Sequence, residues 1–177
     1  MPMSRLIASL WGTVLAVGVS VAALAPVHAV NASAARDEAA IKALEARFAD
    51  GFNAKDVDAI MDVYARGSGL FVFDVTPPRQ HSGWADYKAD WQDLFKAFPG
   101  AIHFSISDLS IAVVGPVAYG HSIQQVLFTQ ANGSKVDNVL RVTDVYRKIH
   151  GRWLIVQEHV SVPVDSHTGK ADWLSKP

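Results

Sequence analysis

The sequence contains no cysteine and no strong excess of charge of either sign. The absence of cysteine excludes disulfide bridges, thiol nucleophiles and thiolate metal ligands. The 177 residues carry 16 lysines and arginines against 17 aspartates and glutamates, a formal net charge of −1. A nucleic-acid partner is therefore not expected, because it would need a basic surface.

Several chemical motifs are also absent. The chain has no internal repeat, no glycine-rich phosphate loop and no Gly-x-Ser-x-Gly nucleophile elbow. Among its histidines, His81, His103, His121 and His159 are scattered without the spacing of a metal site such as His-Glu-x-x-His. The sequence therefore predicts no metal site, and we expect a function that needs no cofactor.

The N-terminal segment has the layout of a secretory signal peptide. Arg5 precedes a mostly apolar run from Leu6 to Ala25, and small-residue cleavage points follow at Val27-His28-Ala29 and Ala32-Ser33-Ala34. A run close to the roughly 20 residues that span a bilayer could also remain as an uncleaved anchor. We interpret residues 1–34 as a signal peptide, which predicts a secreted or periplasmic protein without membrane contact after cleavage.

The rest of the chain predicts helices first and strands afterwards. Apolar residues recur at helical spacing from Ile41 to Phe52, again after a candidate N-cap at Asp56, and from Ser82 to the Pro99-Gly100 breaker. A short strand, GLFVFDV, lies between the second and third helices, and four alternating segments follow Gly100. The alternation of the first segment slips around Ser107-Asp108, which suggests a bulge. This order predicts an α+β domain at residues 35–164, a curved antiparallel sheet wrapped by three N-terminal helices around a cavity, with a tail at 165–177.

Two hairpins decide which side chains face that cavity. Asn132-Gly133 is typical of a two-residue turn, which would place His121 opposite Asp144 on one face of the sheet. We expect a three-residue loop at 149–151, which would put Glu158 and Val160 on the face of Asp144 and would put Trp153, Ile155 and His159 on the other. A two-residue loop there would exchange those faces, because a slip of one residue turns every side chain over.

Three stretches carry a family resemblance. KDVDAIMDVYARG, the strand that ends in Phe-Asp, and TDVYRKIHGRWLIVQEHVS resemble the SnoaL-like and ketosteroid-isomerase-like domains of the nuclear-transport-factor-two-like superfamily. The last stretch is also similar to the association domain of calmodulin-dependent kinases. The resemblance spans roughly residues 36–164 and implies a cone-shaped sheet that forms homodimers through its outer face.

The resemblance also implies site residues. In ketosteroid isomerases an aspartate on the first short strand abstracts a proton, and this position corresponds to Asp74. The second acid falls at Thr143 or Asp144, and we choose Asp144 because the first hairpin sets it beside His121. The family's hydrogen-bonding tyrosine falls near Phe48, which has no hydroxyl group.

The sequence thus predicts a cavity with two kinds of residue. The candidate catalytic residues are Asp74, Asp144 and His121. The candidate ligand-contacting residues are Phe48, Tyr64, Phe73, Trp91, Gln125 and Glu158. The hypotheses are an isomerase, dehydratase or cyclase that acts on a small apolar molecule, a binding module for such a molecule, and a dimerisation module.

Overall fold

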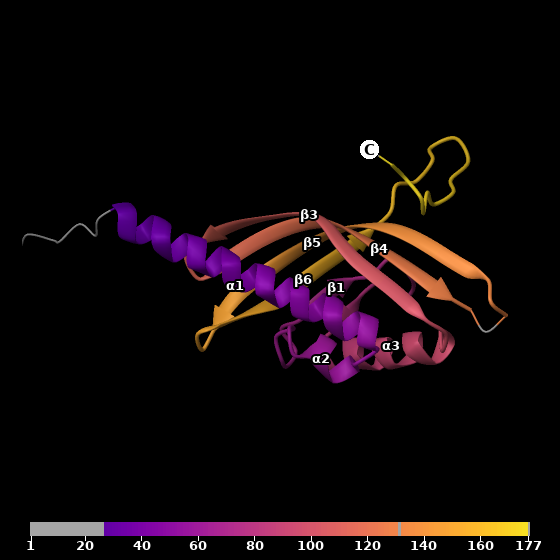
Figure 1. The fold of residues 1–177 in the computed structure, drawn as a ribbon, viewed down its shortest axis with the longest axis horizontal. Helices are drawn as coiled ribbons and strands as arrows, with labels where there is room; N and C mark the ends of the chain where they lie inside the picture. Colours follow the sequence, from indigo (N-terminus) through magenta and orange to yellow (C-terminus); the bar gives the residue numbers. More distant parts are fainter. Residues whose placement is uncertain (1–26, 131, 177) are drawn as a thin grey trace, which may run out of the picture.

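A computed structural model describes residues 27–130 and 132–176. Three helices lie on one face of a six-stranded sheet that arches over them (Figure 1). The helices are α1 (Val27–Ala54), α2 (Val57–Met61) and α3 (Trp84–Ala97), and the strands are β1 (Phe71–Phe73), β2 (His81–Ser82), β3 (Ile102–Val114), β4 (Val117–Thr129), β5 (Lys135–Ile149) and β6 (Arg152–Ser161). The strand order is β2-β1-β6-β5-β4-β3, and β1 alone pairs in parallel, with β6. The predicted α+β fold is confirmed.

The N-terminal prediction falls largely outside this description. Residues 1–26 of the predicted signal peptide lie outside the described residues, and α1 begins at Val27. Within residues 27–130 and 132–176, no helix has the length and apolar character needed to cross a membrane.

The three predicted helices are all present. The Asp56 side chain caps α2 by accepting a hydrogen bond from the Ala59 N–H at 3.0 Å, as its position predicted. That helix is shorter than expected, because Tyr64 lies beyond its end and forms an isolated bridge with Ile155. The bridge brings Tyr64 under β6, where its side chain is fully buried.

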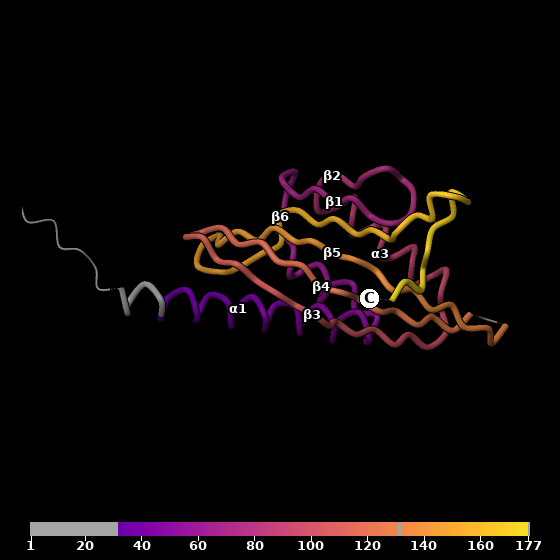
Figure 2. The backbone as a smooth tube through the Cα atoms, turned by 90° about the horizontal axis from the view of Figure 1, so that it is seen from above, coloured from indigo at the N-terminus to yellow at the C-terminus, as the bar shows by residue number. Residues whose placement is uncertain are grey.

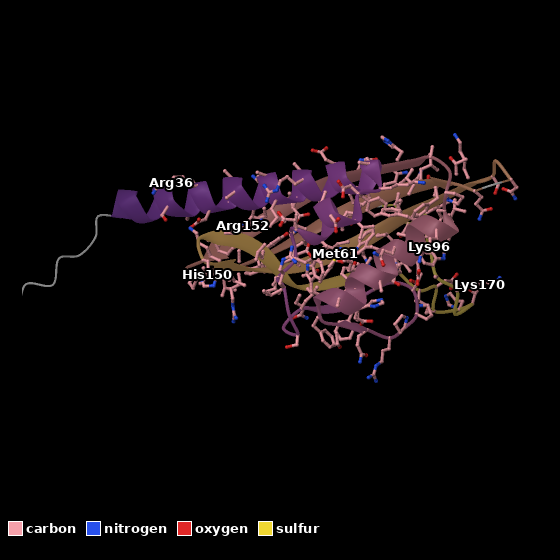
Figure 3. The ribbon with its side chains drawn as sticks, turned by 90° about the horizontal axis from the view of Figure 1, so that it is seen from below. Arg36, Met61, Lys96, His150, Arg152 and Lys170 are labelled. Carbon is pink, nitrogen blue, oxygen red and sulfur yellow. The ribbon has the colours of Figure 1, made fainter. Side chains whose placement is uncertain are left out.

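Side-chain contacts hold α1 against the sheet along its length. Near its C-terminus, the Asn53 amide donates to the Phe104 carbonyl at 3.0 Å and accepts from the Phe104 N–H at 2.8 Å. Further towards its N-terminus, Asp37 accepts hydrogen bonds from Lys148 and Trp153 of the β5–β6 hairpin. Figure 2 shows α1 running beside β3, and Figure 3 shows His150 and Arg152 of the β5–β6 hairpin beside the same helix.

The first hairpin differs from the prediction by one residue. The Gln130 N–H donates to the Ser134 carbonyl at 2.8 Å, so three residues separate the paired ends of the strands instead of two. Gly133, with a φ of 81°, takes the left-handed position that closes such a loop.

The slip reverses the predicted faces of β4. Asp144 lies opposite Gly120, and His121 lies opposite Thr143. His121 is therefore exposed on the outer face, whereas Asp144 is buried on the inner face. The prediction that His121 and Asp144 are neighbours on one face is wrong.

The second hairpin places Glu158 on the predicted face, although its loop is not the expected one. Its loop has two residues, because Ile149 pairs with Arg152, and Trp153 and Ile155 consequently face inward. A register shift after Ile155 then adds one residue, so Glu158 also faces inward, opposite Asp144. Glu158 on the face of Asp144 is confirmed, whereas the outward orientation that the same prediction gave Trp153 and Ile155 is wrong.

Candidate functional site

A cavity of about 170 Å³ lies between the helices and the inner face of the sheet. Six aromatic rings form one large part of its wall: Phe48, Phe52, Trp91, Phe98, Phe104 and Phe128. The rings pack closely, with the stacked centroids of Phe52 and Phe104 4.4 Å apart. Trp173 of the C-terminal tail also lines the cavity, and its carbonyl accepts the Val139 N–H at 2.7 Å.

Few polar groups reach this aromatic space. They are Asp74, Thr76, Tyr87, Asp90, Gln124, Asn138 and Glu158. No arginine or lysine lines the cavity among the described residues. A bound molecule would therefore meet mostly apolar side chains, with carboxyl, amide and hydroxyl groups at a few points of the wall.

Glu158 is the most enclosed carboxyl group of the cavity wall. Its Oε2 accepts a hydrogen bond from the Tyr64 hydroxyl at 2.7 Å, and its Oε1 accepts one from the Tyr87 hydroxyl at 2.8 Å. Burial raises the pKa of Glu158 to about 7, although the two tyrosine hydrogen bonds act in the opposite direction. The residue can therefore gain or lose a proton near neutral pH.

Two further carboxyl groups lie behind Glu158 in the core. The Tyr146 hydroxyl donates to Glu45 at 2.9 Å and lies 3.4 Å from Asp144. Burial raises the pKa of Glu45 to about 7 and that of Asp144 well above its ordinary value, to which the charges of Glu158 and Glu45 also contribute. One oxygen of Asp144 has no hydrogen-bond partner, so its carboxyl group is best accommodated in the protonated form.

Asp74 follows β1 and reaches the cavity from another side. Its carboxylate accepts a hydrogen bond from the Val75 N–H, which fixes its orientation. Burial raises its pKa, and the nearby charge of Asp90 adds to the effect. His81 on β2 and Asp90 on α3 lie beside it.

The structure brings together some of the predicted site residues. Asp74, Phe48, Trp91 and Glu158 line the cavity. Tyr64 lies behind it and reaches it through Glu158.

Other predicted residues do not reach the cavity. His121 is exposed on the outer face, where Gln125 also lies and hydrogen-bonds Asp137 at 3.0 Å. Phe73 packs against His159 with ring centroids 5.5 Å apart. Asp144 is buried but does not line the cavity. His121 and Gln125 do not reach the cavity because the one-residue slip of the first hairpin turns odd-numbered residues of this part of β4 outward.

Sequence reasoning missed Glu45, Tyr87, His81 and Asp90. Glu45 and Tyr87 had a usable signal, because each lies on the apolar face of its helix: Glu45 is four residues after Ile41 and three before Phe48, and Tyr87 is four before Trp91. His81 had none, because it lies on a strand of two residues that no periodicity can indicate.

Comparisons with known proteins agree with this architecture. A family model for the SnoaL-like domain matches residues 41–165. The chain belongs to the SnoaL-like family. No curated protein matches the chain significantly.

Solved structures place this SnoaL-like chain in the NTF2-like fold. An NTF2-like protein of unknown function from Pseudomonas putida is 26% identical, and the match covers 81% of this chain and 98% of that one with a TM-score of 0.73. A proposed dehydratase of the NTF2-like family from Streptomyces avermitilis is 15% identical over 71% of this chain and 95% of that one, with a TM-score of 0.64. An NTF2-like protein from Novosphingobium aromaticivorans, 15% identical over 80% and 92% of the two chains, has a TM-score of 0.67. The last two likenesses show the fold alone.

Proposed function

We propose that this SnoaL-like protein binds a small, single-ring carbonyl compound in its aromatic cavity and moves a proton on it, with Glu158 as the group that takes and returns the proton. The observation that carries this proposal is the position of Glu158, a carboxyl group at the wall of an apolar cavity that is held by two tyrosine hydroxyls. The protein would work in the periplasm or outside the cell, as the predicted leader indicates.

The size and lining of the cavity support the substrate class. A dry cavity of about 150 Å³ is enough to hold benzene, so the cavity of about 170 Å³ suits one ring with a small substituent. Four fused steroid rings would not fit without movement of the aromatic wall. The absence of lysine and arginine from the described cavity lining disfavours a phosphorylated or strongly anionic substrate.

The reaction follows from general acid–base chemistry. The Glu158 carboxylate removes a proton from the carbon next to the carbonyl group; that C–H bond breaks, an O–H bond forms on Glu158, and the electron pair moves to the carbonyl oxygen. Return of the proton to a different carbon gives an isomer, and no cofactor is consumed. The two tyrosines hold both Glu158 oxygens in place, so little reorganisation is needed during transfer.

Dehydration is the related outcome if the substrate carries a hydroxyl group one carbon further away. The enolate then expels that group instead of recovering its proton, and a second acid must protonate the leaving oxygen. Asp74 and Asp90 are the further carboxyl groups at the cavity wall. The Streptomyces avermitilis protein, described as a proposed dehydratase, supports this variant of the same chemistry.

Solvent exchange tests the proposal without knowledge of the natural substrate. A panel of single-ring ketones and enones in D₂O is followed by proton NMR, which reads the loss of the signal next to the carbonyl group. We expect Glu158→Gln to slow enzyme-dependent exchange by about 100-fold or more, since general base catalysis contributes that much. Asp93→Asn, an exposed position on α3, is the matched control and should exchange at the wild-type rate.

The alternative is a binding protein without turnover, and Phe48 favours it. This residue lines the cavity, and the family resemblance sets it near the position where ketosteroid isomerases carry a tyrosine, so that hydroxyl donor would be missing here. Saturable binding of a ring compound, with no exchange above the background rate and equal affinity for Glu158→Gln, would replace the enzyme proposal with this one.

A further inference from the structure

Three side chains from separate elements converge at one end of the cavity. Asp74 follows β1, His81 lies on β2 and Asp90 lies on α3, and one potential ligand atom from each lies within 4.8 Å of the others. Ligands on opposite sides of one transition-metal ion, bound at about 2.0–2.2 Å each, lie about 4.4 Å apart. Small side-chain rotations would therefore bring all three atoms into one coordination sphere.

Among the residues that the structure describes, none makes a side-chain hydrogen bond with His81 that would explain its burial. The residue is 4% exposed, and its Nδ1 has no hydrogen-bond partner. The carboxylate oxygens nearest its two ring nitrogens are those of Asp86, at 3.5 Å from Nδ1, and Asp90, at 3.7 Å from Nε2. Asp86 already accepts the Ser82 N–H at 2.9 Å. Nε2 faces Asp90 and would therefore be the atom that coordinates an ion, and a proton on Nδ1 would then point towards Asp86. Metal-binding histidines commonly donate their second ring N–H to a carboxylate in this way.

The charge around this group is one-sided. Asp74 and Asp90 are half-buried carboxyl groups on the same cavity wall. Within residues 27–130 and 132–176, no lysine or arginine nitrogen lies within 4.0 Å of either one, and Lys88 of the same helix pairs with Asp58 instead. A cation between Asp74 and Asp90 would compensate the repulsion between their carboxylates, which no described lysine or arginine side chain offsets.

Strand β2 holds His81 in position at this site. The strand has two residues and pairs only with β1, through Phe71 with Ser82 and Val72 with His81. Because Val72 also pairs with Glu158 of β6, the ladder fixes His81 relative to the cavity wall. So short a strand adds little to the sheet, but it holds the imidazole beside Asp74 and Asp90.

We infer that Asp74, His81 and Asp90 form a binding site for one divalent first-row transition-metal ion at the end of the cavity. A ligand set of one imidazole and two carboxylates suits Mn²⁺, Fe²⁺ or Zn²⁺ better than a set of oxygen ligands alone does. Three protein ligands leave at least one coordination position open, as catalytic metal sites do. Asp74 and Asp90 both line the cavity, so the open position faces it.

The role of the ion rests on the proposed function, but its binding does not. An ion here would accept the carbonyl oxygen of the ring compound and stabilise the enolate that Glu158 generates. Asp74 would then be a metal ligand, and the proton transfer that the family resemblance implies for this position would belong to Glu158. Metal binding can be measured with no substrate present.

Titration calorimetry on chelator-treated full-length protein tests the site, with Zn²⁺ and Mn²⁺ as probes. We expect one ion per chain, and a dissociation constant at least about tenfold weaker in His81→Gln and in Asp90→Asn, since even outer-sphere partners of a metal contribute that much. Asp93→Asn, one turn along α3 from Asp90, is the matched control. Pulsed electron paramagnetic resonance of the Mn²⁺ form should show coupling to one imidazole nitrogen, lost in His81→Gln.

The outcomes separate this inference from the proposed function. Glu158→Gln should retain metal affinity while losing proton exchange, because Glu158 is not one of the three ligands. If His81→Gln fails to fold, as judged by circular dichroism, Asp90→Asn decides the question, because its side chain is 32% exposed and tolerates an amide. No binding at 1 mM of either ion, or equal affinity in wild type and Asp90→Asn, would overturn the site.

Discussion

Glu45→Gln should remove part of the pH dependence of folding stability. Glu45 is 2% exposed, and burial raises its pKa from 4.5 to about 7 in the folded protein. The folded state therefore holds this proton more tightly than the unfolded chain does. The resulting stability is fully present below pH 4.5 and is lost as pH rises through about 7. Glutamine has nearly the same shape, stays neutral at every pH, and still accepts the Tyr146 hydrogen bond.

The magnitude follows from the size of the shift. One pKa unit corresponds to about 1.4 kcal/mol, so through Glu45 itself the wild-type protein should lose about 2.5 kcal/mol more than Glu45→Gln between pH 5 and pH 8. The charge of Glu45 also raises the pKa of Asp144 and of Glu158, so its removal reduces their pH dependence in the same direction and adds to the difference. Asp37, whose pKa the Lys148 hydrogen bond lowers, affects stability only below its ordinary value of 3.8, outside this window.

Urea unfolding at pH 5, 6, 7 and 8, monitored by tryptophan fluorescence, measures the effect. Asp50→Asn, an exposed position on the same helix, serves as the control and should follow the wild-type curve. Parallel curves for wild type and Glu45→Gln would refute the reasoning, because they would mean that Glu45 has the same proton affinity in the folded and the unfolded chain.

Two further substitutions test the packing that positions the site. Asn53→Ala removes both hydrogen bonds to Phe104 and should lower the free energy of unfolding by about 1–3 kcal/mol, measured by urea titration. Asn53→Asp keeps the acceptor for the Phe104 N–H but sets an oxygen against the Phe104 carbonyl, so it should recover little of that loss. Gly120→Ala places a methyl group 3.0 Å from the Ser110 carbonyl and 3.3 Å from the Tyr146 ring, so it should destabilise the protein by about 1–3 kcal/mol. The exposed Gly69, whose added methyl group would meet nothing within 4 Å, is its control, and an equal effect at both positions would contradict the packing argument.

The sequence predicted the order and type of the larger elements because their patterns are local. Apolar spacing located the three helices, Asp56 marked the start of α2, and the interrupted alternation at Ser107-Asp108 predicted the bulge that β3 shows. The positive φ of Asp108, 52°, is the backbone distortion behind that interruption. These signals depend on neighbouring residues, and tertiary structure overrode them at Tyr64, where the bridge to Ile155 replaces a further turn of α2.

The site was less predictable because it depends on register. Asn132-Gly133 suits a two-residue turn, and nothing in its composition shows that the loop has three residues, with Gln130 and Ser134 as the paired ends of the strands. That single residue decided whether His121 faced the cavity or the outer surface. The convergence of Asp74, His81 and Asp90 was equally hidden, because spatial proximity of residues from a loop, a two-residue strand and a helix leaves no periodic trace.

The register shift in β6 separates two halves of the strand that bury residues of opposite parity. Before it, odd-numbered residues such as Trp153 and Ile155 are buried, and after it the even-numbered Glu158 and Val160 are buried. Deleting the extra residue would restore an unbroken alternation, in which Ile155 and Glu158 both still face inward. The shift is therefore a point at which the strand can lose one residue while the Trp153 half and the Glu158 half both keep their faces.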